Sequence, residues 1–226
     1  MKLGIIARSK GRCDCKRLLS KMIPIMAVMG SWSYLFVHLT MAQNHAAASE
    51  LVQKLRSDET TDEARKQLLQ LGQSEPDVRR YLATQLPPLI EIGPKSCASS
   101  KIVDLVARWH ACPWYNAVEL SGNLKIGEAA PALARWISWR SEGPYGLSLE
   151  ARLVFHPAAK ALAQIGDPAI PAVQHALDHG NADEHYKAVR VLCIIHSANA
   201  KAVLRGDLPH ETDPALQTMI KNDLRE

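Results

Sequence analysis

Apolar residues recur at intervals of three and four along most of the chain after residue 43. Residues with this spacing share one face of a helix, whereas a half-buried strand would alternate apolar and polar residues. No stretch of the sequence alternates convincingly, and the β-branched and aromatic runs typical of strands are missing. The pattern predicts an all-α body over residues 43–226. Its apolar stripes are Ala64, Leu68 and Leu71; Ile102, Leu105, Val106 and Trp109; Ala130, Leu133 and Ile137; Ile170, Val173 and Leu177; Ala188, Val189, Leu192 and Ile195; and Leu216, Met219 and Ile220.

Glycine and proline residues divide the stretch 157–178 into two short helices joined by a tight corner. Gly166 can adopt the left-handed conformation that ends a helix. Asp167 can then cap the following helix, with Pro168 in its first turn, where no backbone N–H is needed. The same corner is repeated around Gly127, 39 to 40 residues earlier. We therefore expect two-helix units that follow one another along the chain.

The stretch 157–178, PAAKALAQIGDPAIPAVQHALD, resembles the short HEAT-like repeat found in many bacterial proteins and in the phycobilin lyases. The resemblance is strong over 157–197 and good over 117–138, and it extends more weakly to 61–91 and 97–116. A helical hairpin that recurs at roughly 40 residues is typical of solenoids. The resemblance implies a short α-solenoid of HEAT-like hairpins, each of which buries its apolar face against its neighbours. It implies little about function, because such repeats serve many different ends.

Residues 22–42 carry no charged side chain and follow a basic segment with seven Lys and Arg residues and one Asp. A basic segment, an apolar segment and then small residues is the order of a secretory signal, and we expect cleavage after Ala42 or close by. Because the uncharged run reaches the roughly 20 residues that span a bilayer, a retained N-terminal anchor is the alternative. Residues 1–42 are thus a signal peptide or an anchor. In both cases we expect residues 43–226 outside the cytoplasm, secreted or periplasmic, with membrane contact only through an uncleaved leader.

The net charge of the chain is +4, from 27 Lys and Arg against 23 Asp and Glu. Without the seven positive side chains and one negative side chain of the leader, 20 positive and 22 negative side chains remain, so the body carries about −2. Nucleic-acid binding requires a concentration of positive charge that this body lacks. We therefore expect no nucleic-acid partner.

Three cysteines lie in the body, Cys97, Cys112 and Cys193. In an oxidising compartment they allow one disulfide and one free thiol, and Cys97 with Cys112 is the simplest pair because the loop between them is short. The alternative is three buried thiols that act as small hydrophobic side chains.

Three histidines are the candidate metal ligands, His175, His179 and His185. The first two stand four residues apart at the end of a predicted helix, where two imidazoles can face one ion and a nearby carboxylate could complete the shell. A histidine at a helix C-terminus also interacts favourably with the helix dipole, and this structural interpretation is preferred. We therefore expect no bound metal and no cofactor. We expect no catalytic residue either, since the sequence contains no nucleophile, zinc-protease or nucleotide-binding fingerprint.

Aromatic residues cluster in the middle of the body. Trp136 falls on an apolar stripe and is expected in the core. The other aromatic side chains could anchor a partner, because they offer a large rigid surface with a polar edge. They could equally fill the joint between irregular repeats, as tryptophan is highly buried on average. The candidates for partner contact at the surface are Trp114, Tyr115, Trp139 and Tyr145.

The sequence favours a non-enzymatic scaffold for protein–protein interaction, exported or tethered outside the cytoplasm. It would offer a helical face and the loop over residues 140–156 to another protein, whose identity the sequence does not reveal. A metal-dependent enzyme on the same helical array, using His175, His179 and His185, is the first alternative. A structural module of a larger exported assembly is the second.

Overall fold

The computed structural model describes residues 42–56, 61–97, 112–140, 153 and 155–225. All regular secondary structure within these ranges is helical, and no strand occurs there, which confirms the all-α prediction. The chain divides into two units, Met1–Gln43 and Asn44–Glu226, and the description below concerns the second. Among the described residues, no helix combines the length and the apolar character needed to cross a bilayer. Except for Ala42, the predicted leader lies outside the described residues.

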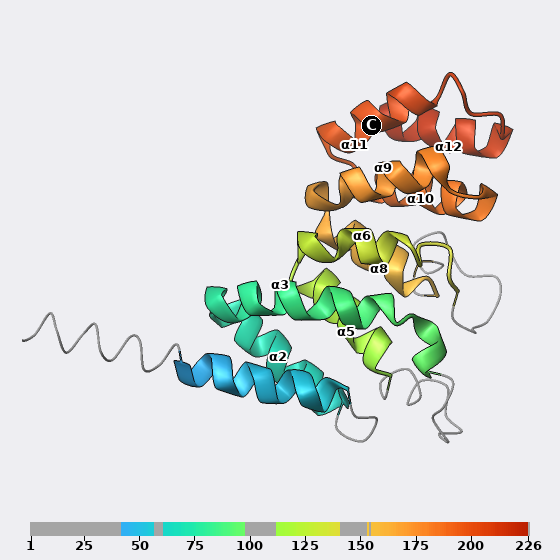
Figure 1. Cartoon of the computed structure of the whole chain (residues 1–226). Helices are drawn as coiled ribbons and strands as arrows, with labels where there is room; N and C mark the ends of the chain where they lie inside the picture. The colour runs from blue at the N-terminus through green and yellow to red at the C-terminus, as the bar shows by residue number, and fades with distance from the viewer. Residues whose placement is uncertain (1–41, 57–60, 98–111, 141–152, 154, 226) are drawn as a thin grey trace, which may run out of the picture. The chain divides into compact units, whose positions relative to one another are not determined.

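The second unit consists of short helices that pack in two rows (Figure 1). After a helical stretch over residues 44–55, the α-helices are α2 (Thr61–Ser74), α3 (Pro76–Glu91), α5 (Pro113–Asn123), α6 (Ala130–Ala134), α8 (Pro157–Ile165), α9 (Ile170–His179), α10 (Ala182–Ile195), α11 (Ala198–Asp207) and α12 (Pro214–Arg225). One row runs α2, α5, α8, α10 and α12, and the other runs α3, α6, α9 and α11. Helices of opposite rows also contact each other, in the pairs α2–α3, α3–α5, α6–α8, α9–α10, α10–α11 and α11–α12, so hairpins such as α6–α8 and α9–α10 lie side by side.

Small residues bring neighbouring helices of one row close together. In α5, a Cβ added to Gly122 would lie 2.9 Å from the Cα of Ala161 in α8, so the two backbones approach at this point. Larger side chains then fill the space around the small ones, and Leu120 and Leu162 are fully buried. Each such leucine contributes roughly 1.5 to 3 kcal/mol to folding through the area that it removes from water. A single hairpin buries too little of this area alone, and contact with its neighbours supplies the rest.

The corner between α8 and α9 has the expected glycine but a different cap. Gly166 has φ 79° and ψ −140°, which confirms the predicted positive φ. The prediction that Asp167 caps the next helix is wrong, because Asp167 is the first residue of the 3₁₀ helix η3 (Asp167–Ala169), whose N-cap is Gly166, and the N-cap of α9 is Ala169. With this extra turn α9 begins later, so Pro168 lies in the first turn of η3. The Asp167 carboxylate accepts a hydrogen bond from the amide Nδ2 of Asn199 in α11 at 2.8 Å.

The corner between α5 and α6 is built from different residues. Its 3₁₀ helix η2 (Gly127–Ala129) begins 40 residues before η3, so Gly127 corresponds to Asp167. The prediction that Gly127 matches Gly166 is therefore wrong by one residue. The positive φ of this corner, 51°, belongs to Lys125. Gly127 instead allows a close approach, since a Cβ there would lie 2.9 Å from the Cβ of Pro168 in the next corner.

We expect the substitution Gly166→Ala to lower the free energy of unfolding by about 1–3 kcal/mol, because a side chain disfavours this backbone conformation. Gly206→Ala in α11 is the matched control, since an added Cβ meets no atom within 4 Å at either position. Gly206 has no positive φ, so this control should leave stability unchanged or raise it by up to about 1 kcal/mol. Urea denaturation followed by circular dichroism measures both. Equal effects of the two substitutions would contradict the role given to Gly166.

The cysteines of the described residues have different states. Cys112 is disulfide-bonded and Cys193 is a free thiol, so the alternative of three free thiols is wrong. The side chain of Cys97 lies outside the described residues, and its pairing with Cys112 stays a prediction. Burial raises the pKa of the Cys193 thiol to about 12. Because the thiolate is the reactive form, Cys193 is expected to be inert at neutral pH.

Candidate functional site between helices α6 and α9

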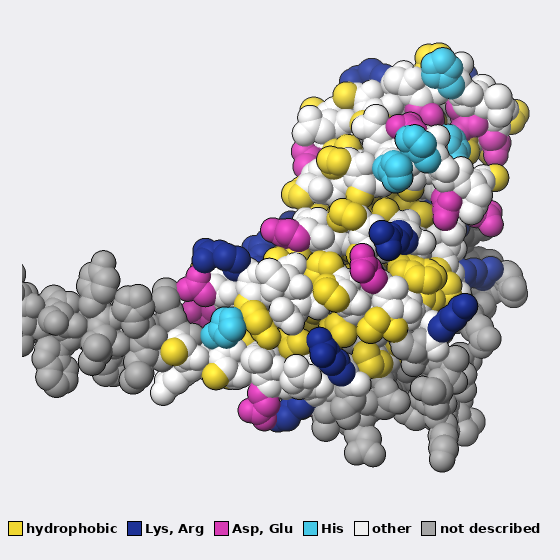
Figure 2. All heavy atoms as spheres, viewed as in Figure 1, with side chains coloured by type: hydrophobic (Ala, Val, Ile, Leu, Met, Phe, Trp, Pro, Cys, Tyr) yellow, Lys and Arg dark blue, Asp and Glu magenta, His cyan; other side chains and the backbone are white. Residues whose placement is uncertain are grey.

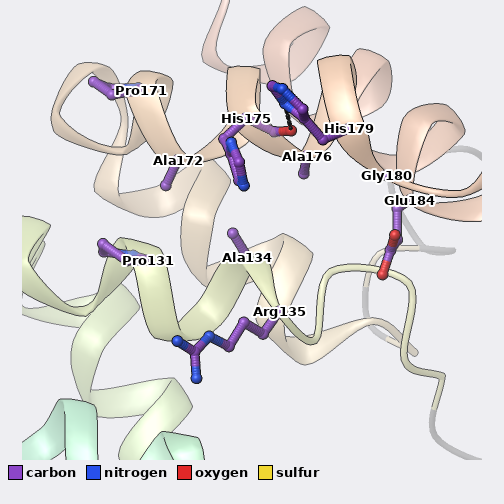
Figure 3. A pocket seen from close by; sticks show the side chains of 10 residues that line it. All are labelled: Pro131, Ala134, Arg135, Pro171, Ala172, His175, Ala176, His179, Gly180 and Glu184. Atoms are coloured by element: carbon purple, nitrogen blue, oxygen red, sulfur yellow. Dashed lines mark hydrogen bonds between the residues drawn. The ribbon is translucent and has the colours of Figure 1, made fainter.

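A groove of about 580 Å³ lies between α6 and α9 (Figure 3). Figure 2 shows histidine side chains gathered over this part of the molecule, next to hydrophobic ones. The two helices occupy matched positions in successive hairpins, and both belong to the row that contains α3 and α11. The groove is therefore a gap between neighbours in one row, and its chemistry depends on the side chains that the two helices turn toward each other.

The floor of the groove is apolar, because the facing sides of both helices carry small residues. Pro131 and Pro171 occupy the first turns of α6 and α9, where a missing backbone N–H costs nothing. Ala134 of α6 lies opposite Ala172 and Ala176 of α9 (Figure 3). Side chains this short do not close the space between the helices. The floor can therefore accept an apolar side chain from another molecule.

Arg135 lines the groove at the end of α6. The Nη1 atom of its guanidinium lies 3.7 Å from the Glu91 Oε1, and the two side chains are 69% and 53% exposed. An ion pair this long and this exposed contributes little free energy. A guanidinium has five N–H donors in a planar fork that matches the two oxygens of a carboxylate. Figure 3 shows the Arg135 side chain extending away from α9, so its guanidinium can bind an anionic group of a segment that extends past the groove floor.

His175 and His179 both line the groove but point in different directions. Their rings stack with centroids 4.5 Å apart and planes at 29°. Figure 3 shows the ring of His175 directed toward α6 and that of His179 turned away from it. The Nδ1 of His179 lies 3.2 Å from the backbone carbonyl oxygen of His175, so it donates a hydrogen bond within the helix end.

The structure does not bring the three candidate metal ligands together. The ring of His185 contacts Glu211 through Nε2 at 2.8 Å and the carbonyl oxygen of Leu177 through Nδ1 at 3.0 Å. Within the described part of the chain, the ligand group that includes His185 contains neither His175 nor His179. The set of three histidines suggested by the sequence is therefore wrong as a metal site. Sequence spacing misled here because His185 belongs to the next helix, α10, and its ring contacts the Leu177 carbonyl and Glu211 instead of the other two histidines.

The far end of the groove is formed by the start of α10. The Asn181 side chain accepts hydrogen bonds from the backbone N–H groups of Asp183 and Glu184, at 3.0 and 3.1 Å. In return the Glu184 carboxylate accepts one from the backbone N–H of Asn181 at 2.8 Å. This capping box holds Glu184 in place and places a negative charge at this end of the groove.

The predicted aromatic contact residues do not form one surface. Trp114 is 0% exposed, so its assignment to the surface is wrong. Its ring meets that of Trp139 edge to face, with centroids 4.8 Å apart and an angle of 74°. Tyr115 and Trp139 are half-buried against the same core, and burial raises the pKa of Tyr115 to about 12. Tyr145 and most of the loop over residues 140–156 lie outside the described residues.

Sequence reasoning did not identify the groove, although a signal for it exists. Pro131 and Pro171 stand 40 residues apart, at the same offset as η2 and η3. Residues at this offset occupy equivalent places in adjacent hairpins, so the small side chains near them could have been paired across the gap. The depth of the groove depends on how closely the hairpins stack, which a single sequence does not reveal.

No protein-family model, no curated protein and no solved structure matches the chain. The function is therefore argued from the groove itself.

Proposed function

We propose that this protein is a non-enzymatic scaffold, built as a short HEAT-like α-solenoid, whose groove between α6 and α9 binds an acidic segment of a partner protein. The solenoid is supported by the order of contacts within each row and by the offset of 40 residues between η2 and η3. It is also supported by contacts between successive corners. The Arg79 guanidinium donates to the Lys125 carbonyl at 3.1 Å, Pro168 packs on Gly127, and Asp167 accepts from Asn199.

The observation that carries the proposed function is the composition of the groove. An apolar floor of alanine and proline lies beside the exposed guanidinium of Arg135 and the ring of His175. A partner segment could bury an apolar side chain against the floor and place a carboxylate next to it, where it would pair with the Arg135 guanidinium. Charge-assisted hydrogen bonds from a guanidinium to a carboxylate are about twice as strong as neutral ones, and they fix the orientation of the ligand. A segment rich in Lys or Arg would instead face like charge at Arg135.

We also propose that the protein acts outside the cytoplasm, either after removal of residues 1–42 or tethered by them. The order of charges in that leader supports the proposal. The disulfide at Cys112 supports it as well, because disulfides persist mainly in oxidising compartments. N-terminal sequencing of the purified protein shows whether residues 1–42 are removed or retained. A protein that begins at Met1 and remains with the cytoplasmic fraction would contradict export in both forms.

The binding proposal is tested with a phage-displayed library of random peptides and the full-length chain. We expect enriched peptides to carry Asp or Glu next to an apolar residue. Arg135→Glu should weaken their binding at least about tenfold, which corresponds to about 1.4 kcal/mol, because it replaces an attractive charge by a repulsive one. Isothermal titration with a synthetic copy of an enriched peptide measures the effect.

Arg205→Glu is the matched control for this experiment. Arg205 is an exposed residue in the last turn of α11 and does not line the groove, so its charge reversal should change affinity less than about twofold. Enrichment of basic peptides would contradict the proposal, as would an equal loss of affinity in the two variants.

A further inference from the structure

A second group of polar side chains lies near the C-terminal end of α9, where the ring of His185 contacts the Leu177 carbonyl. It consists of His185 in the first turns of α10, Asp207 at the end of α11 and Glu211 in the turn before α12. One nitrogen or oxygen atom from each of these side chains lies within 4.8 Å of the others. Asp207 and Glu211 come from one turn, since the backbone N–H of Glu211 donates to the Asp207 carbonyl at 3.1 Å.

The imidazole of His185 is held as metal-binding histidines are held in proteins. Its Nδ1 lies 3.0 Å from the carbonyl oxygen of Leu177, so this nitrogen carries a proton and donates it. The hydrogen bond fixes the orientation of the ring and leaves Nε2 directed at the carboxylates, 2.8 Å from the Oε2 of Glu211. A histidine that binds metal through one ring nitrogen commonly donates a hydrogen bond from the other ring nitrogen to a backbone carbonyl.

Both carboxylates are also prepared for a ligand. The Oε1 of Glu211 accepts a hydrogen bond from the backbone N–H of Asp213 at 2.7 Å, which orients the carboxylate and keeps Oε2 toward His185. Glu211 is buried, with only 5% of its side chain exposed. Within the described residues, the Oδ2 of Asp207 is buried and has no hydrogen-bond partner. A buried carboxylate oxygen without a partner costs free energy, and a cation would remove that cost.

The charges around the group favour a cation. Two carboxylates face one imidazole, and the charge of Asp178 also acts on Asp207. The positive charges that act on Asp207 come from His185 and His210. A proton on His185 balances the negative charge of one carboxylate. A divalent ion in place of that proton would balance the charge of both.

We propose that His185, Asp207 and Glu211 form a binding site for a divalent transition-metal ion, with Zn²⁺ the best match. Imidazole nitrogen together with carboxylate oxygen is a ligand set that Zn²⁺ accepts, at distances of about 2.0–2.2 Å. The ion would take the place of the proton between Nε2 and Oε2, and that proton would leave to solvent. Since 27% of the His185 side chain is exposed, water can reach the remaining coordination position. The bound ion would link the start of α10 to the turn between α11 and α12.

The test uses the full-length chain, purified without a histidine tag, and Zn²⁺ alone. We expect Zn²⁺ to raise the melting temperature and to bind with one-to-one stoichiometry in isothermal titration. Asp207→Asn and Glu211→Gln should each weaken binding at least about tenfold, because each removes a charged ligand. Asp207→Asn keeps the test decisive if the buried Glu211→Gln variant does not fold.

The double variant His175→Ala/His179→Ala is the matched control. These histidines stand four residues apart on α9 and are the competing place where Zn²⁺ could bind, yet the proposal predicts unchanged affinity. Co²⁺ provides a second readout, since its visible spectrum should show nitrogen and oxygen ligands without a thiolate charge-transfer band. The proposal is overturned if Zn²⁺ does not bind the wild-type chain, if Asp207→Asn keeps wild-type affinity, or if the double variant loses binding. A thiolate band with Co²⁺ would overturn it too, by assigning the ion to a cysteine.

Discussion

Replacing Trp114 by alanine is expected to lower the free energy of unfolding by about 3–5 kcal/mol. The indole is fully buried at the start of α5 and packs edge to face on Trp139. Its removal gives up the largest single block of apolar contact in this part of the core and leaves a cavity that the surrounding helices cannot fill. Against a total stability of about 5–15 kcal/mol for a domain, the loss is large. Urea denaturation followed by circular dichroism measures it.

Two further variants separate packing from hydrogen bonding at this site. The Nε1 of Trp114 is buried and has no hydrogen-bond partner among the described residues, so Trp114→Phe removes no hydrogen bond and should cost much less than the alanine variant. Ile194→Ala in α10 removes apolar surface from a side chain that is 40% exposed and should cost less than about 1 kcal/mol. If Trp114→Ala is no more destabilising than Ile194→Ala, Trp114 does not belong to the core as described.

Lowering the pH from about 7 to about 5 is expected to cost about 2 kcal/mol of stability through His156 alone. This histidine precedes α8 and is 6% exposed. Burial lowers its pKa from 6.5 to about 4, and the positive charge of Lys187 in α10 adds to this effect, as do Arg140 and Arg190. The hydrogen bond from Nδ1 to the Trp139 carbonyl, at 3.0 Å, opposes the shift only in part. Between the two pKa values the unfolded chain binds more protons, so stability is complete above about 6.5 and falls as the pH drops toward 4.

His156→Asn isolates this contribution. The asparagine amide can donate to the same carbonyl and does not titrate, so the variant should show a flatter dependence of unfolding free energy on pH than the wild type. His210→Asn, at an exposed position, should keep the wild-type slope. Urea titrations at several pH values measure the slopes, and differences between variants cancel the contributions of the remaining groups. A wild-type slope in His156→Asn would assign the pH dependence to another residue.

Local features of the fold could be predicted from the sequence because they depend on neighbours along the chain. Leu162, Ile165 and Val173 are buried where the spacing of apolar residues placed them. The positive φ of Gly166 followed from the composition of the corner. The role of Asp167 could not be predicted, because its hydrogen-bond partner, Asn199, belongs to another hairpin.

The candidate sites were less predictable for the same physical reason. His185 and Glu211 meet across 26 positions of sequence, and the pairing depends on how α10 packs against the C-terminal helices. Tryptophan is a residue type that often contacts binding partners, but Trp114 is buried in the core. Only the packing of the folded chain distinguishes these two roles. The groove likewise arises between two helices whose small residues look unremarkable in each helix taken alone.

A tandem copy of the 40 residues 167–206 would carry Asp167 and Asn199 together. Their hydrogen bond would then be reproduced in each added copy. An insertion of another length would shift these partners out of reach of one another. The solenoid that we propose would therefore favour growth by whole duplications, and relatives of different length should differ by multiples of this unit.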